Sequence, residues 1–383
     1  MTSAPSHHTS CDVIILGAGM AGASLAAELA PQRRVVLLER EDQPGRHATG
    51  RSAAMFFESY GNATVRALTR ASRDFLLHPP QGFTEAPLMQ RRDAMIFADT
   101  SRLVQLDAML SAPGAAACLH RIGASEALRI CPILRPQAVA GALLDVSGHD
   151  MDVSALHQAY LRQARRGAVQ LVLDAGETAL SRADGLWQVK VRSQVFSAPV
   201  LVNAAGAWAD AVAAQAGVPG VGLQPMRRTA MTLDAPDGLD IHAWPLVVDV
   251  GEGFYFKPDA GQILLSPANE DPSPPCDAAP DELDVAIAVD RFESATTLQV
   301  RRIRHRWSGL RSFVADRSPV AGFEPAFTGF FWLAGQGGYG IQMAPALARA
   351  AASLLLGQPM PADIVAEGVT AAELSPARPG LRG

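Results

Sequence analysis

Three glycines and one glutamate near the beginning of the chain have the types and the spacing that bind a dinucleotide. Gly17, Gly19 and Gly22 form a G-x-G-x-x-G motif. The first permits a tight turn, the second lets backbone approach a pyrophosphate, and the third lets a helix pack closely on a strand. Glu39 follows where a carboxylate can accept both hydroxyls of an adenosine ribose and would repel a 2′-phosphate. These residues predict FAD or NAD as the ligand, and not NADP.

The elements that must position these residues are visible in the surrounding sequence. Residues 13–16 and 35–38 are short apolar runs typical of buried strands. The helix expected between them begins at Met20 and ends near Ala30. Its free N–H groups and the positive end of its dipole would point at the pyrophosphate. We therefore interpret residues 11–39 as one strand–helix–strand unit.

Three further segments suit the lining of a flavin, which needs more backbone around it than a nicotinamide does. Residues 47–55 and 203–208 are rich in small side chains, and residues 335–342 place a glycine cluster before a helix, where positive potential stabilises a reduced flavin. An ordinary helix-entry loop and a glycine cap on a core helix are the alternatives for the first and third. The candidate cofactor-binding residues are Gly17, Gly19, Met20, Ala21, Gly22, Glu39, Arg40, Thr49, Arg51, Ser52, Ala53, Ala54, Ala205, Gly206, Trp208, Gly335, Gly337, Gly338, Tyr339, Gly340, Ile341 and Gln342.

Length, composition and charge restrict the class of protein. A chain of 383 residues exceeds the usual size of a single core, so two domains are expected. The chain is 48% hydrophobic and 19% charged, which is typical of a globular protein, and its net charge of -5 offers no basic face for nucleic acid. Cys11, Cys118, Cys131 and Cys276 lack the spacing of metal ligands. We expect reduced thiols, no metal and a cytoplasmic location.

No leader and no membrane span are expected from the sequence. The first ten residues lack a charged stretch followed by an apolar one. No run of eighteen apolar residues occurs, and Arg349 interrupts the apolar residues 344–356. Peripheral contact with the inner membrane and the oligomeric state stay open.

Helices and strands alternate along the remaining chain. The expected helices are 59–77, 150–166 and 345–356. The expected strands are 94–98, 169–173, 187–191, 199–203, 228–233, 254–257, 262–266 and 329–334.

Several motifs make the chain resemble the D-amino-acid oxidase and dehydrogenase superfamily of FAD enzymes, and within it the bacterial D-arginine dehydrogenase group. The matching motifs are residues 17–22, 49–54, 202–208, 254–259, 308–316 and 336–342. The resemblance implies FAD as the cofactor, a D-amino acid as the substrate, and a quinone or another electron acceptor as the partner. Oxidation would occur at Cα by hydride transfer to flavin N5, giving an imino acid that water hydrolyses to a 2-oxo acid and ammonia.

The expected fold class is α/β, with a Rossmann-like FAD-binding domain and an inserted α+β substrate domain built on a large antiparallel sheet. Residues 1–80, 145–217 and 306–383 are assigned to the FAD-binding domain. Residues 81–144 and 218–305 are assigned to the substrate-binding domain.

Two arginines are the candidates for holding the substrate carboxylate. A planar guanidinium binds a carboxylate through two parallel hydrogen bonds and fixes its orientation. In the context of the family motifs we choose Arg311 and Arg228. Arg227 is the rival to Arg228, because neighbours on a strand point to opposite faces, and which of them faces the substrate stays open.

Similarity to the family suggests further site residues. Tyr255 would add a hydroxyl to the carboxylate, and Tyr60 would close the pocket. The Gly338 carbonyl would accept a hydrogen bond from the substrate amine, and Gln342 would orient nearby groups. No histidine or aspartate base is needed, because the amine can lose its proton to solvent.

The substrate preference is where the chain departs from the D-arginine enzymes. Their active-site loop resembles Ala-Ala-His-Tyr-Thr and a strand acid meets the guanidinium, whereas here residues 53–57 include Met55 and Phe57, and Ala94 takes the position of the acid. Asp93 is offset by one residue, which turns its side chain to the other face. A cationic side chain would lack a partner. We expect neutral or hydrophobic D-amino acids such as leucine, methionine or phenylalanine; alternatively, Met55 and Phe57 only fill the core.

Other functions fit the same pattern. A glycine or sarcosine oxidase and a 2-hydroxy-acid dehydrogenase would use the same FAD architecture. A noncatalytic flavin-binding protein is the alternative outside enzymes, although a mere binder needs no paired arginines.

Overall fold

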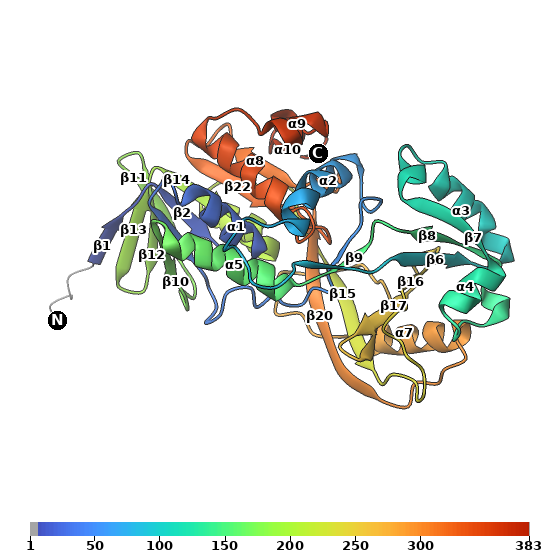
Figure 1. Ribbon diagram of the computed structural model, residues 1–383. Coiled ribbons are helices and arrows are strands. Elements are labelled where there is room, and N and C mark those ends of the chain that lie inside the picture. The colour runs from blue at the N-terminus through green and yellow to red at the C-terminus, as the bar shows by residue number, and fades with distance from the viewer. Residues whose placement is uncertain (1–6, 383) are drawn as a thin grey trace.

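The computed structural model describes residues 7–382 and contains two large sheets with helices packed around them (Figure 1). Residue 383 and the first six residues lie outside the described residues, and the expectation about a leader falls partly on those six. The α-helices are α1 (Met20–Leu29), α2 (Ala63–Leu77), α3 (Leu103–Leu110), α4 (Ala124–Ile130), α5 (Val153–Arg166), α6 (Ala209–Gln215), α7 (Glu282–Ala295), α8 (Ala344–Leu356), α9 (Ala362–Ala366) and α10 (Ala371–Leu374). The 3-10 helices are η1 (Thr100–Arg102), η2 (Ala115–Ala117), η3 (Pro136–Ala138) and η4 (Gly206–Trp208). None of the helices described for residues 7–382 combines the length and apolar character that a membrane crossing requires.

A six-stranded sheet contains the strand–helix–strand unit expected at the start of the chain. Its order is β10-β3-β2-β14-β22-β21, and every pair except β21 with β22 is parallel. Its strands are β2 (Val13–Leu16), β3 (Val35–Leu38), β10 (Val169–Val172), β14 (Val200–Asn203), β21 (Val320–Phe323) and β22 (Phe330–Ala334). The central strands β2 and β3 are buried along their whole length, as a parallel sheet covered on both faces requires.

Alternate residues of this sheet belong to two different cores. One face packs on α1, α5 and α8, and the other packs on a four-stranded sheet in the order β1-β13-β12-β11. The strands of this smaller sheet are β1 (His7–Ser10), β11 (Ala179–Ala183), β12 (Leu186–Val191) and β13 (Gln194–Ala198). On β2, for example, Val13 and Ile15 face the helices while Ile14 and Leu16 face the smaller sheet.

The second large sheet has nine strands. Its order is β19-β15-β18-β17-β16-β6-β8-β7 with β20 also paired to β15, and every pair except β16 with β6 is antiparallel. Its strands are β6 (Ala94–Ala98), β7 (Leu119–Gly123), β8 (Gly141–Asp145), β15 (Gln224–Leu233), β16 (Leu246–Asp249), β17 (Tyr255–Asp259), β18 (Gln262–Ser266), β19 (Asp271–Pro272) and β20 (Ile303–Phe313). A three-stranded sheet joins β4 (Met55–Phe56), β9 (His149–Met151) and β5 (Met89–Arg91). The long strands β15 and β20 run side by side near the middle of the molecule (Figure 1).

The expected fold class is confirmed, and two helix starts are corrected. The helix expected from residue 59 begins at Ala63, because the Asn62 side chain accepts a hydrogen bond from the Val65 N–H and caps it. The helix expected from residue 150 begins at Val153, because Asp152 caps it in the same way. The proposed domain boundaries stay a prediction; the one between residues 305 and 306 falls inside β20.

Candidate functional site

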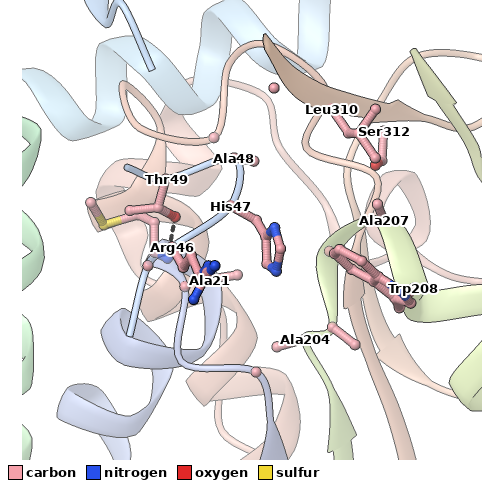
Figure 2. Close-up of a pocket in the computed structure, with 18 of the residues that line it drawn as sticks. Ala21, Arg46, His47, Ala48, Thr49, Ala204, Ala207, Trp208, Leu310 and Ser312 are labelled. Atoms are coloured by element: carbon pink, nitrogen blue, oxygen red, sulfur yellow. Dashed lines mark hydrogen bonds between the residues drawn. The ribbon is translucent and has the colours of Figure 1, made fainter. Parts of the chain in front are cut away.

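A cavity of about 910 Å³ is lined by residues of both large sheets. Figure 2 shows the part of it that lies between the loop carrying Thr49 and the segment carrying Trp208. Most of the predicted cofactor residues line it, although they come from segments far apart in the sequence. They are Gly17, Gly19, Met20, Ala21, Glu39, Arg40, Thr49, Arg51, Ser52, Ala53, Ala205, Gly206, Trp208, Gly335, Gly337, Gly338, Gly340 and Ile341.

The glycines of the first motif leave no room for side chains. Gly17 has a φ of +99°, and a Cβ there would lie 2.5 Å from the Ala204 carbonyl oxygen. A Cβ on Gly22 would lie 1.9 Å from the Gly17 carbonyl oxygen, so its absence lets α1 pack against the turn. Gly22 therefore shapes the site without lining it. A dinucleotide fits this site, because at the start of α1 the backbone can approach the diphosphate of the ligand without obstruction by side chains.

The Glu39 carboxylate is held in place by backbone groups. It accepts hydrogen bonds from the Ala18 N–H at 2.9 Å and the Glu41 N–H at 3.0 Å, and only 8% of the residue is exposed. Glu39 also lines the cavity, at the end of β3. This carboxylate is therefore oriented before any ligand arrives, as recognition of ribose hydroxyls requires.

Arg51 lines the cavity but directs its guanidinium toward protein groups. Its Nη1 donates to the carbonyl oxygens of Ala278 at 2.9 Å and Ser308 at 3.0 Å, and its Nη2 pairs with Asp277. The Arg51 guanidinium holds the pKa of the Asp277 carboxyl below its usual range. Its side chain thus ties the loop after residue 49 to the segment 276–278.

Four predicted cofactor residues do not line the cavity. Tyr339 packs edge-on against Tyr60, with ring centroids 4.9 Å apart. The Gln342 side chain is buried, donates to the Thr69 hydroxyl at 2.9 Å and accepts from the Phe57 N–H at 3.2 Å. Gly22 and Ala54 complete the four, and none of them is among the lining residues. Gln342 thus connects α2 to the loop near residue 57 and does not reach the open space.

Arg228, Arg311 and Tyr255 line the other part of the cavity. Met226 pairs with Arg311 and Arg228 pairs with Gly309 across β15 and β20, which places both arginines on one face of the sheet. Arg227 points to the opposite face, where it forms ion pairs with three aspartates at 3.2 to 3.6 Å. Arg228, and not Arg227, therefore faces the cavity.

The two cavity arginines differ in their partners. Arg228 is 8% exposed, and it donates to the Asn269 carbonyl oxygen at 2.7 Å and to Glu270 at 3.1 Å. Arg311 has a buried Nη1 atom with no hydrogen-bond partner among the described residues. Gly338 lies against this guanidinium, because a Cβ there would come within 2.9 Å of Nη1. Such a buried donor is costly unless a ligand supplies an acceptor.

Positive charge dominates this part of the cavity. Burial and the nearby charge of Arg311 lower the pKa of Arg228. Burial would raise the pKa of Tyr255, but the charges of Arg311 and Arg228 outweigh it, and the pKa of Tyr255 lies below its usual value. The arrangement favours an anionic ligand.

The remaining predicted substrate residues form an apolar cluster beside Tyr255. Phe57, Ala94 and Leu246 are its buried members, and Met55, Tyr60, Val248 and Tyr255 pack against it. The sequence expectation that Met55, Phe57 and Ala94 belong together is consistent with this contact. Among the residues of this cluster Tyr255 lines the cavity, whereas Tyr60, Met55, Phe57 and Ala94 do not.

Two features of the site were missed by sequence reasoning. Asn269 and Glu270 hold Arg228 from a loop more than forty residues away, and no local pattern signals such a contact. His47 lines the cavity and hydrogen-bonds Glu41; its segment, residues 47–55, was predicted to line a flavin, but the His47 side chain was not among the candidate residues. No group of three or more His, Cys, Asp or Glu side chains within residues 7–382 is arranged to hold a metal ion.

One family model matches most of the chain. The model of the family described as "FAD dependent oxidoreductase" (DAO) matches residues 12–354. The uncharacterized oxidoreductase YurR of Bacillus subtilis is 26% identical, over 92% of this chain and 96% of that protein. The bovine FAD-dependent oxidoreductase domain-containing protein 1 is 26% identical, but the match covers 43% of this chain and spans only 37% of that protein's length.

Solved structures share the fold at low identity. Glycine oxidase from Geobacillus kaustophilus superposes with a TM-score of 0.80 at 21% identity, covering 97% of this chain and 99% of that one. L-alpha-glycerophosphate oxidase from Mycoplasma pneumoniae, with FAD bound, has a TM-score of 0.80 at 18% identity, covering 91% of this chain and 95% of that one. The cavity described here thus belongs to a fold that binds FAD in a solved structure.

Proposed function

Since the chain belongs to the DAO family of FAD dependent oxidoreductases, we propose that it oxidises neutral or hydrophobic D-amino acids to 2-oxo acids and ammonia. FAD is the cofactor, and when bound it supplies the oxidant that accepts a hydride from the substrate. As a dehydrogenase the protein would pass the electrons on to a quinone or another acceptor. The free thiols of all four cysteines support a reducing, cytoplasmic location as part of the same proposal.

The observation that carries this proposal is the pair Arg228 and Arg311. Both lie on one sheet face in the cavity, and Arg311 keeps an unpartnered buried Nη1 atom. A substrate carboxylate would satisfy this donor and would be held rigidly by charge-assisted hydrogen bonds. Tyr255, which also lines the cavity, would add its hydroxyl. Such positioning lowers the barrier by removing the freedom of the reacting carbon.

The chemistry asks little else of the protein. The substrate ammonium loses a proton to solvent, Cα then loses its hydrogen with the bonding electron pair, and a C=N bond forms. Water hydrolyses the resulting imino acid to the 2-oxo acid and ammonia. The Gly338 carbonyl, beside Arg311, would orient the amine. No side-chain base is required.

The apolar cluster supports a neutral side chain on the substrate. Phe57, Ala94 and Leu246 pack with Tyr255, the member of the cluster that lines the cavity, and a cationic group extending toward them would lose its water without gaining a partner. The preference for the D configuration rests on the motif resemblance. Oxidases of glycine or sarcosine and dehydrogenases of 2-hydroxy acids are the competing outcomes, because their substrates carry the same carboxylate.

Anaerobic mixing with a panel of D- and L-amino acids and 2-hydroxy acids tests the proposal. We expect loss of flavin absorbance with D-leucine, D-methionine or D-phenylalanine, release of ammonia, and slow reaction with D-arginine. Formation of stoichiometric peroxide in air would show that the protein is an oxidase and not a dehydrogenase. Reduction by 2-hydroxy acids alone would contradict the proposal, and FAD that is bound but never reduced would indicate a noncatalytic protein.

A further inference from the structure

His47 has one ring nitrogen engaged and one free. Its Nε2 lies 2.9 Å from a carboxylate oxygen of Glu41, so Nε2 carries the hydrogen of this bond. Its Nδ1 atom is buried and has no hydrogen-bond partner among residues 7–382. The ring packs on Trp208, with centroids 4.6 Å apart, and lines the cavity. Figure 2 shows the ring between the loop that carries Thr49 and the Trp208 ring.

His157 provides the contrast of a purely structural histidine. Its Nε2 bonds the Ala18 carbonyl oxygen at 2.9 Å, the residue is 4% exposed, and burial lowers its pKa. A neutral ring that supports the turn at residue 18 explains these facts. His47 differs, because the residue lines the cavity and its buried Nδ1 has no partner among the described residues.

The surroundings of His47 indicate which part of the ligand it meets. Two residues further along, the Thr49 hydroxyl accepts a hydrogen bond from the Met20 N–H at 2.9 Å, in the first turn of α1. The start of a helix after a glycine-rich turn is where a dinucleotide places its diphosphate. Glu39 is already oriented for the ribose. An anionic oxygen is therefore the group that best matches a ring backed by a carboxylate.

We propose that His47 is a cofactor-binding residue whose protonated Nδ1 donates a hydrogen bond to the diphosphate of FAD. Glu41 holds Nε2–H and stabilises the imidazolium from the other side. The inference depends on FAD binding alone, so it stands or falls independently of the substrate proposed above.

Some charged groups around the His47 ring favour its protonation and others oppose it. Glu41 contacts it, and Asp277 of the neighbouring segment lies close enough for His47 to help lower the pKa of Asp277, after the larger effect of Arg51. Arg46 pairs with Glu41 at 3.8 Å and opposes protonation, and the Arg40 guanidinium lies 5.7 Å from the centroid of the Trp208 ring that packs on His47. A bound diphosphate adds negative charge and tips this balance toward the imidazolium.

The sign of the pH dependence follows from proton counting. The bound state holds one proton more than the free state, so FAD binding takes up a proton and raising the pH opposes it. An imidazole titrates between about pH 5 and 8. The affinity for FAD is therefore fully developed at low pH and falls as the pH rises through the bound-state titration.

Equilibrium release of FAD from the diluted holoenzyme tests the proposal at pH 6 to 9. Free FAD is read from its fluorescence, and proton uptake is measured by calorimetry in buffers of different ionisation enthalpy. For the unmodified protein we expect the dissociation constant to rise about tenfold over this range, with proton uptake on binding.

Two variants at position 47 separate the effect of the hydrogen bond that the side chain donates from the effect of its packing. His47→Asn retains a neutral N–H donor, so we expect FAD binding to become independent of pH, with no proton uptake. His47→Leu removes the donor, and we expect binding about tenfold weaker at pH 6 but equal to the unmodified protein at pH 9. Glu41→Gln removes the supporting charge and should move the loss of affinity to lower pH.

The matched control is His120→Asn, on the exposed edge strand β7. It should leave the pH profile unchanged. If His47→Leu fails to fold, His47→Asn alone decides the matter. A pH profile and proton uptake that persist in His47→Asn, or an FAD affinity that rises with pH in the unmodified protein, would overturn the proposal.

Discussion

The two ends of the cavity are built in different ways. At the cofactor end, backbone and small residues set the shape, and even the Glu39 carboxylate is fixed by two backbone N–H groups. At the substrate end, Arg228 of β15 is buried and depends on a distant partner, Glu270, whereas Arg311 of β20 is half-buried and keeps one buried, unpartnered nitrogen. The cofactor end is therefore sensitive to added atoms, whereas the substrate end is sensitive to lost charge.

The same contrast separates the two arginines. Arg228 has protein partners without a ligand, whereas Arg311 leaves a buried donor unpaired. A ligand gains most from the group that lacks a partner. Arg311 should thus contribute more to substrate binding, and Arg228 more to the stability of the loop at residues 269 and 270.

Replacing Arg311 by methionine should have the largest effect. Two charge-assisted hydrogen bonds would be lost, and we expect kcat/KM to fall about 1,000-fold, or ~4 kcal/mol. The FAD content and the affinity for FAD should not change, because the cofactor end is untouched. Steady-state kinetics and the absorbance ratio of the purified protein measure both. Arg228→Met is the comparison, and we expect a smaller kinetic loss with a lower melting temperature.

Replacing Gly22 by alanine should break the cofactor end. The new Cβ would lie 1.9 Å from the Gly17 carbonyl oxygen, a backbone atom that cannot move without opening the turn. We expect a destabilisation of about 3 kcal/mol together with loss of bound FAD. Gly82→Ala is the control for a glycine-to-alanine change, because no atom lies within 4 Å of the new Cβ. The φ of +77° at Gly82 adds backbone strain, but no side-chain clash. Normal FAD content in Gly22→Ala would contradict the described packing.

Replacing Ala94 by glutamate should change the preference at the substrate end. Ala94 is 3% exposed and belongs to the apolar cluster. A carboxylate there would give a cationic substrate side chain a partner, so turnover of D-lysine or D-arginine relative to D-leucine should rise about tenfold. Ala94→Gln is the uncharged control. An unchanged ratio in Ala94→Glu would mean that this cluster is only core.

Chemical modification of the cysteine thiols should show the smallest difference among these tests, and it changes no residue of the sequence. Cys276 is half-buried and lines the cavity, whereas Cys11, Cys118 and Cys131 are buried. Burial raises the pKa values of these three to about 11, about 11 and about 12, so they stay protonated at pH 8 and react slowly. One fast-reacting thiol is expected, and bound FAD should slow it severalfold. Cys276→Ser identifies it, and equal rates with and without FAD would contradict its position.

The sequence predicts the cofactor end better than the substrate end for a physical reason. Gly22 and Glu39 act through contacts with Gly17 and Ala18, within a short stretch of chain, so their spacing determines their geometry. Arg51 is predicted to bind the cofactor and lines the cavity, while its guanidinium contacts Asp277 and Ala278, more than 200 residues away. No local pattern encodes that partner.

Strand alternation in the sequence says less about the two neighbouring arginines than the observed sheet does. It separates Arg227 from Arg228 but does not say which face is covered. The aspartates paired with Arg227 come from β19 and from the start of α7, and their position depends on the tertiary fold. The strands β2, β3, β6 and β18 were predicted to the residue, because buried apolar runs of this length have few alternatives.

The most direct test of the arginine pair compares D-leucine with D-leucinamide, which lacks the carboxylate. Anaerobic flavin reduction is followed with both compounds in the unmodified protein and in Arg311→Met. The unmodified protein should favour D-leucine strongly, and this preference should largely disappear in Arg311→Met, because the amide never engaged Arg311. A preference of the same size in both proteins would show that Arg311 does not hold the substrate carboxylate.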